Sequence, residues 1–154
     1  MFKTSKMWKS EIEEIMRYDD TFIGCYPHDR LPKFNGRKNC STIINTGDSG
    51  TKGEHWVAIK MTNQNCFYFD SFGLEIVEEN IKKFACNYDK VLYSNLCIQD
   101  IRSEKCGNFC IAFLKSVNTV NQYDRFINMF DDSYLYVNDF IVHDIMKKIT
   151  KKTK

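Results

Sequence analysis

The 154-residue chain has no run of about 18 apolar residues, the length that a helix needs to cross a lipid bilayer. Its first residues, MFKTSKMWKSEIEEIMRY, also lack the apolar stretch of a secretory signal peptide. Prolines are scarce, since the only two fall in one early loop, and the sequence contains no repeat, low-complexity segment or linker. These absences argue against a membrane protein, a secreted protein and a multidomain chain. We therefore expect one domain over residues 1–154, located inside the cell.

A charge excess of one sign is also lacking, because the net charge is only +2. Five lysines lie in the tail formed by residues 147–154, so the rest of the chain is slightly acidic. A basic body that would bind nucleic acid over a broad surface is therefore not expected. We expect the tail to be a solvated chain end. Contact of its lysines with nucleic acid or an acidic surface is the alternative.

Nothing in the sequence predicts a metal site. There are three histidines, and neither His28 nor His143 has cysteine or carboxylate neighbours at ligand spacing. The spacing of Cys106 and Cys110 in CGNFC fits neither a CxxC redox pair nor a zinc set with a second ligand pair. Cysteines number seven, an odd count, and without a secretory signal we expect them to be mostly reduced thiols.

Hydrophobic residues make up 43% of the chain and aromatic residues 14%, enough to bury a core. Hydrophobic periodicity predicts helices over Trp8–Tyr18 (capped by Ser10), Glu75–Tyr88 and Cys106–Val120, with one or two more between residues 121 and 148. Strands are predicted over Phe22–Tyr26, Cys40–Asn45, His55–Met61, Cys66–Asp70 and Lys90–Ser94. Helices and strands alternate irregularly, which indicates an α+β fold with a mixed central sheet flanked by helices.

A hairpin formed by HWVAIKM and CFYFD would bring two chemically useful side chains together. His55 opens the first strand and Asp70 closes its partner, so both lie at the same end of the pair. A carboxylate there accepts the imidazole N–H and fixes the tautomer and orientation of the ring. Taken alone, His55 is better explained as an ordinary surface or core histidine at a hairpin end.

The candidate nucleophile is Cys106, where a polar loop gives way to an apolar helix. Unpaired N–H groups at a helix N-terminus favour the thiolate and lower the pKa of a cysteine placed there. Gly107 would let a substrate backbone approach closely, and Cys110, one turn later, should face the core. Gln99, seven residues before Cys106, could direct its amide at a developing oxyanion together with the Cys106 backbone N–H. On its own, Cys106 is better explained as a small buried residue at a helix start, and only its combination with His55 and Asp70 favours a nucleophile.

Three separated motifs add to this set. They are Gly53-Glu54-His55-Trp56, then CFYFDSFG at residues 66–73, and finally Gln99 followed by CGNFC at residues 106–110. In this order and spacing they resemble the G-x-H-W, C-Y-x-F-E-P-F-G and Q-x₆-C-G-x-F-C motifs of the adenovirus maturation protease (adenain) family and its relatives in virophages and self-synthesising transposons. Flanking similarity extends the resemblance over residues 21–115.

This resemblance implies a papain-like cysteine protease fold and gives each residue a role. Cys106 would be the nucleophile, His55 the base and Asp70 its orienter, while Gln99 and the backbone around Gly107 would hold the oxyanion. Substrates would be viral structural precursors, cut next to small residues at glycine-rich sites during virion maturation. The substrate-binding residues would be Trp56, Gly53 and Glu54, with Trp56 and the loop at residues 46–53 forming narrow subsites. We expect a monomer in the infected host cell, in the cytoplasm, nucleus or viral factory, that is also packaged in the virion.

The sequence departs from the family pattern at two points. Asp70 replaces the usual glutamate, although aspartate serves in the related SUMO-processing proteases, which have one residue fewer between glutamine and cysteine. Tyr88 stands where the family has the cysteine that pairs with a peptide cofactor; Cys86 is close by. No cofactor is required by the sequence itself, while the resemblance implies a peptide activator and DNA bound through the lysine-rich tail.

Two alternatives remain open at this point. The same scaffold serves ubiquitin- or SUMO-deconjugating proteases and acyltransferases that act on host proteins. A non-catalytic capsid-associated or nucleic-acid-binding domain would also keep the fold, although the complete set of Cys106, His55 and Asp70 speaks against it.

Overall fold

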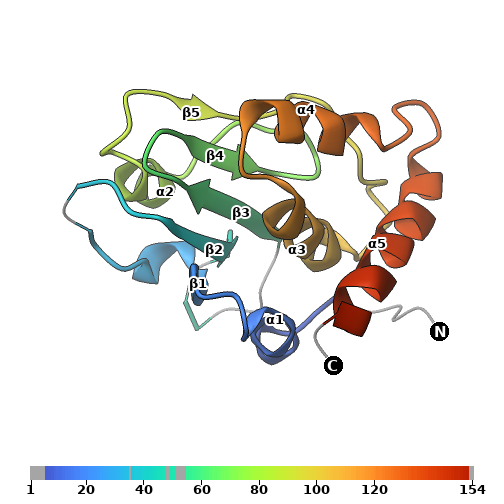
Figure 1. Ribbon diagram of the computed structural model, residues 1–154, viewed down its shortest axis with the longest axis horizontal. Helices are drawn as coiled ribbons and strands as arrows, with labels where there is room; N and C mark the ends of the chain where they lie inside the picture. The colour runs from blue at the N-terminus through green and yellow to red at the C-terminus, as the bar shows by residue number, and fades with distance from the viewer. Residues whose placement is uncertain (1–5, 35, 48, 51–54, 153–154) are drawn as a thin grey trace.

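The computed structural model describes residues 6–34, 36–47, 49–50 and 55–152, which form a mixed five-stranded sheet with helices on both faces (Figure 1). The strands are β1 (Phe22–Pro27), β2 (Cys40–Asn45), β3 (Trp56–Met61), β4 (Cys66–Phe69) and β5 (Val91–Leu92), and they lie side by side in sequence order. The outer pairs β1–β2 and β4–β5 are parallel, and the inner pairs are antiparallel. The α+β prediction is confirmed.

Each central strand is buried along its whole length because both faces of the sheet are covered. On one face, Ala58, Phe67 and Phe69 join the larger core with α1 (Lys9–Met16), α3 (Cys106–Ser116), α4 (Val120–Asn128) and α5 (Asn138–Lys152). On the other face, Val57 and Tyr68 pack with α2 (Glu79–Phe84). Adjacent residues therefore alternate between two cores, as the period of two in a strand requires.

The helix α3 lies in the middle of the larger core, which Figure 1 shows between the sheet and α5. Eight of its eleven residues are buried, so its N-terminal residue Cys106 is held by packing on every side. Phe113, for example, stacks on Phe69 of β4 with ring centroids 4.8 Å apart. Such a buried helix provides a rigid platform for a side chain at its first turn.

Several predicted boundaries were wrong. The helix predicted over Glu75–Tyr88 forms only as α2, because residues 74–78 adopt no regular secondary structure after the turn at Gly73. The strand predicted over Lys90–Ser94 shrinks to β5, and the helix predicted to Val120 ends at Ser116. Ser10 lies inside α1 and does not cap it; the Glu11 carboxylate instead accepts the Trp8 backbone N–H at 2.9 Å.

At the C-terminal end, the predicted solvated tail is helical as far as Lys152, the last described residue, because α5 continues to that point. Short 3-10 turns occur at His28–Arg30 and Leu135–Val137. In the part of the chain that the structure describes, no helix has the length and apolarity to cross a membrane.

Candidate active site

The β3–β4 hairpin brings His55 and Asp70 together. His55 immediately precedes β3, and Asp70 immediately follows β4, with Ala58 paired to Phe69 in the ladder between them. The His55 Nε2 atom lies 2.8 Å from the Asp70 Oδ1 atom. The same carboxylate oxygen accepts the Phe72 backbone N–H at 2.8 Å, so the orientation of Asp70 is fixed as well. With the imidazole N–H donated to this carboxylate, the other ring nitrogen is left for a second partner.

That second partner is Cys106, at the N-terminal end of α3 and only 2% exposed. Burial opposes ionisation of the thiol, but the hydrogen bond and charge of His55 and the backbone N–H of Trp56 outweigh it and lower the pKa of Cys106. Burial likewise opposes protonation of His55, yet Asp70 and Cys106 raise the pKa of the imidazole to about 9. Opposite shifts of this kind favour a thiolate beside an imidazolium.

The other buried cysteines behave in the opposite way. Burial raises the pKa of Cys25 and of Cys66 to about 12, and raises the pKa of Cys110 well above its ordinary range. Cys110 faces the core as expected and donates its thiol to the Trp56 carbonyl oxygen at 3.4 Å. All seven cysteines are free thiols. Cys106 differs from these buried cysteines because His55 and the Trp56 N–H lower the pKa of its thiol.

Gln99 is fixed beside the turn that follows Asp70. Its side-chain oxygen accepts the Ser71 hydroxyl, and its amide nitrogen donates to the Ser103 carbonyl oxygen at 2.9 Å. The Ser71 carbonyl oxygen in turn accepts the backbone N–H of Gln99 at 3.1 Å. The amide carries two hydrogens, and Ser103 takes one of them. The Gln99 side chain is 1% exposed and is preorganised by these bonds, and its second amide hydrogen has no acceptor among the residues that the structure describes.

Two predicted roles need correction. A Cβ on Gly107 would lie 3.3 Å from the Met7 Cβ and 3.4 Å from the Ile12 Cδ1, so the space beside it is filled by the N-terminal segment rather than by substrate. Trp56 is only 6% exposed and donates its indole N–H to the Met7 carbonyl oxygen at 3.1 Å. Its side chain therefore packs in the core and forms no open subsite wall. Gly53 and Glu54 lie outside the described residues.

The position of Phe72 against His55 was not predicted from the sequence. The Phe72 ring stacks on the His55 imidazole, with centroids 4.7 Å apart and planes inclined by 27°. This contact holds the face of the imidazole while Asp70 holds its edge. The available signal was an aromatic residue two positions after the candidate carboxylate, in the sequence FDSF.

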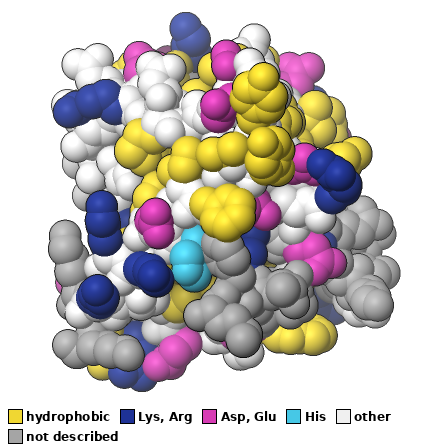
Figure 2. Space-filling model, turned by 90° about the vertical axis from the view of Figure 1, so that its right-hand side faces the viewer, with side chains coloured by type: hydrophobic (Ala, Val, Ile, Leu, Met, Phe, Trp, Pro, Cys, Tyr) yellow, Lys and Arg dark blue, Asp and Glu magenta, His cyan; other side chains and the backbone are white. Residues whose placement is uncertain are grey.

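Two open hollows flank Phe72. One, of about 450 Å³, contains His55 and Asp70 in its lining, and the other, of about 510 Å³, contains Gln99 and Cys97. Leu74 lines both. Figure 2 shows hydrophobic side chains gathered as a band beside a histidine ring on the right-hand side of the molecule in Figure 1. His55 and Asp70 therefore open onto one hollow, and Gln99 opens onto the other.

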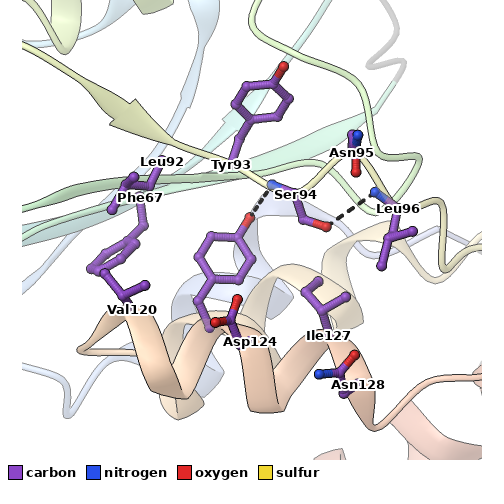
Figure 3. Close-up of a pocket in the computed structure, with 11 residues that line it drawn as sticks. Phe67, Leu92, Tyr93, Ser94, Asn95, Leu96, Val120, Asp124, Ile127 and Asn128 are labelled. Atoms are coloured by element: carbon purple, nitrogen blue, oxygen red, sulfur yellow. Dashed lines mark hydrogen bonds between the residues drawn. The ribbon is translucent and has the colours of Figure 1, made fainter.

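A third hollow lies away from this face, between α4 and the segment that follows β5 (Figure 3). Its volume is about 520 Å³, and Leu92, Leu96 and Ile127 contribute to its walls. The Tyr123 hydroxyl donates to the Tyr68 carbonyl oxygen at 2.6 Å and accepts the Ser94 backbone N–H at 3.2 Å, which anchors α4 to the sheet edge. The lining of this third hollow includes none of the candidate catalytic residues.

In the described ranges, no group of three or more His, Cys, Asp or Glu side chains is placed to hold a metal ion. His28 instead contacts Asn80 at 3.2 Å and Glu78 at 3.4 Å.

A family model described as adenovirus endoprotease matches residues 22–136. The protease of frog adenovirus 1 is 32% identical over 113 residues, which cover 62% of this chain and 54% of the relative. The protease of human adenovirus B serotype 3 is 30% identical over 117 residues, which cover 60% and 55%. The chain thus spans about half the length of these curated relatives. A crystal structure of an ASFV protease superposes with a TM-score of 0.52 at 17% identity, covering 86% of this chain and 65% of that one, and supports the fold.

Proposed function

Because the chain belongs to the adenovirus endoprotease family, we propose that it is a cysteine endopeptidase that cuts viral structural precursor proteins during virion maturation. The observation that supports this most directly is the thiol of Cys106, whose pKa is lowered by His55. His55 is in turn held by Asp70 at 2.8 Å. A nucleophile, a base and an orienting carboxylate are the three groups that amide hydrolysis by a cysteine requires.

In the proposed reaction, the Cys106 Sγ atom attacks the scissile carbonyl carbon and forms a carbon–sulfur bond. The negative charge that develops on the carbonyl oxygen is held by the Gln99 amide and the Cys106 backbone N–H. His55 gives its proton to the departing amine, which breaks the carbon–nitrogen bond and leaves a thioester. Water, deprotonated by His55, then hydrolyses this thioester and restores the thiolate.

We assign the substrate class by family membership. Cleavage is expected next to small residues, at glycine-rich sites, inside infected cells and in the virion. Since Cys106, His55, Asp70 and Gln99 all come from one chain, a monomer suffices for the chemistry.

A peptide activator would bind here without a disulfide at the position that the family uses. That position is Tyr88, which is 8% exposed and bonded through its hydroxyl to the Thr62 carbonyl oxygen. The nearby Cys86 is exposed and remains the alternative thiol. DNA would act through the lysines of the C-terminal tail, since the net charge of the whole chain is only +2.

The test compares the wild type with Cys106→Ala and with Cys86→Ala, which removes an exposed thiol elsewhere. Each protein is incubated with fluorogenic Gly-Gly and Gly-Ala peptides, with and without DNA. Cleavage by the wild type and by Cys86→Ala, but not by Cys106→Ala, supports the proposal. Cleavage that survives in Cys106→Ala, or no cleavage under any condition, contradicts it.

A further inference from the structure

The hollow beside His55 has walls that are unusually apolar for an exposed surface. Phe72 forms its edge against the imidazole, and Leu74 and Val77 lie along it. Leu74 is 60% exposed and Val77 is 75% exposed, although residues of this kind are normally buried. A wall of this kind gains free energy when a long aliphatic chain covers it.

The rim of the same hollow is acidic. Glu75 and Glu78 contribute to the lining, and no lysine or arginine does so among the residues that the structure describes. The Asp70 carboxylate also lines the hollow, beside His55. Of the neighbouring groups, His28 contacts Glu78 at 3.4 Å, whereas Lys82 pairs with Glu79 outside the hollow. Apolar walls with an acidic rim suit a side chain whose stem is aliphatic and whose end is cationic.

The reaction itself indicates which part of a substrate reaches this hollow. His55 must donate its proton to the departing amine nitrogen, so that nitrogen lies at the imidazole. The residues that follow the scissile bond are attached to this nitrogen. A hollow that contains His55 in its lining is therefore placed to receive side chains downstream of the cut.

We propose that the hollow formed by Phe72, Leu74, Val77, Glu75 and Glu78 is a specificity subsite that binds a lysine or arginine side chain within the first three substrate residues after the scissile bond. The proposal rests on the endopeptidase function proposed above and names a feature of its substrate. The aliphatic stem lies on Leu74 and Val77, and the cationic end lies by the two glutamates.

The test uses internally quenched peptides that share one glycine-rich cleavage site. They form pairs with lysine or its neutral isostere norleucine at the first, second or third residue after the cut. At one of these positions we expect kcat/KM to favour lysine about three- to fivefold, the range of an exposed ion pair. The preference should shrink as salt rises to about 0.5 M, because the charges are near the surface.

Variants then assign the preference to the rim. Glu75→Gln should reduce the lysine-to-norleucine ratio, and Glu75→Gln/Glu78→Gln should abolish it. Glu79→Gln is the matched control, because this carboxylate is on α2 with 75% of its side chain exposed, pairs with Lys82 and does not line the hollow. Binding to Cys106→Ala, measured by fluorescence anisotropy, should show the same ratio without catalysis.

The outcomes separate this proposal from the function on which it rests. The subsite proposal fails if the peptides are cleaved with no preference for lysine, or with a preference only at residues before the cut. Either result would still support the endopeptidase function. A preference that persists in the double variant also overturns the subsite proposal. If the wild type cleaves no peptide and Cys106→Ala binds both members of each pair equally, the function and the subsite both fail.

Discussion

His55 and Asp70 are joined by a contact of 2.8 Å across the end of the β3–β4 hairpin, although 15 positions separate them in the chain. The hairpin register places them there, since β3 begins one residue after His55 and β4 ends one residue before Asp70. The imidazole is thus held by a carboxylate at one nitrogen, by the Phe72 ring on its face and by Cys106 as a further partner. Each of these contacts can be tested by a separate substitution.

Asp70→Asn should lower kcat about 10²- to 10⁴-fold, because a neutral amide no longer stabilises the imidazolium that forms at His55. The asparagine oxygen can still accept the Phe72 N–H, so the turn should remain folded. Steady-state kinetics and a thermal melt check both parts. An unchanged kcat in the folded variant would show that Asp70 does not orient His55.

Phe72→Ala should reduce kcat about ten- to a hundredfold, because the imidazole loses the ring that limits its tilt. Phe72 is only partly buried, so the cost in unfolding free energy should be about 1 kcal/mol. Phe72→Tyr keeps the stacking surface and is the matched control. Equal kcat for the alanine and tyrosine variants would contradict a positioning role.

Gln99→Ala should lower kcat about 10²- to 10³-fold with a smaller change in KM, since an oxyanion donor acts mainly in the transition state. Ser71→Ala removes only the hydroxyl that donates a hydrogen bond to the Gln99 side-chain oxygen. The loss of kcat in this variant should therefore be smaller than in Gln99→Ala. A comparison of the two variants by kcat and KM checks the assignment. A larger loss for Ser71→Ala than for Gln99→Ala would contradict it.

Gly73→Ala should destabilise the fold by about 3 kcal/mol, as strained backbone and a direct clash would combine. Gly73 has a φ of +74°, and a Cβ there would lie 2.6 Å from the Leu96 carbonyl carbon and 2.7 Å from the Cys97 nitrogen. Gly36→Ala, also at positive φ but with no atom within 4 Å of the new Cβ, separates backbone strain from the clash. Urea unfolding measures both, and equal losses would contradict the close approach.

Much of the site could be predicted from local pattern. The two short apolar runs in HWVAIKM and CFYFD predicted the hairpin, and the change from polar loop to apolar run placed Cys106 at a helix start. The role of Phe72 could not be predicted in this way, because an aromatic residue after a strand is equally typical of core packing. Its contact with His55 depends on the turn that Gly73 closes through its N–H to the Asp70 carbonyl oxygen at 2.8 Å.

Tertiary contacts explain the predictions that were wrong. Residues 74–78 have helical periodicity, but the preceding turn is pinned against Leu96 and Cys97, so the helix starts only at Glu79. That displacement leaves Leu74 and Val77 on the surface beside His55. Trp56 was expected in a subsite, but its indole N–H donates a hydrogen bond to the Met7 carbonyl oxygen. The two residues are 49 positions apart in the chain. Local sequence pattern carries little information about contacts between residues so far apart in the chain.

The central claim is that His55 keeps Cys106 as a thiolate. Its most direct test is the rate of iodoacetamide alkylation at Cys106, followed by mass spectrometry from pH 5 to 10 in the wild type and in His55→Ala. The rate at an ordinary thiol rises about tenfold per pH unit until its pKa near 8.5. In the wild type the rate should level off below that pH, because the pKa of Cys106 is lowered.

The raised pKa of His55, about 9, also sets an upper limit for catalysis. Its proton is present below that pH and lost above it, so peptide cleavage should fall as pH rises through about 9 while alkylation does not. In His55→Ala, the hydrogen bond and charge of His55 are lost while burial still opposes ionisation of Cys106, so its alkylation should slow at neutral pH and its profile should shift upward. Identical alkylation profiles in the two proteins would contradict the account.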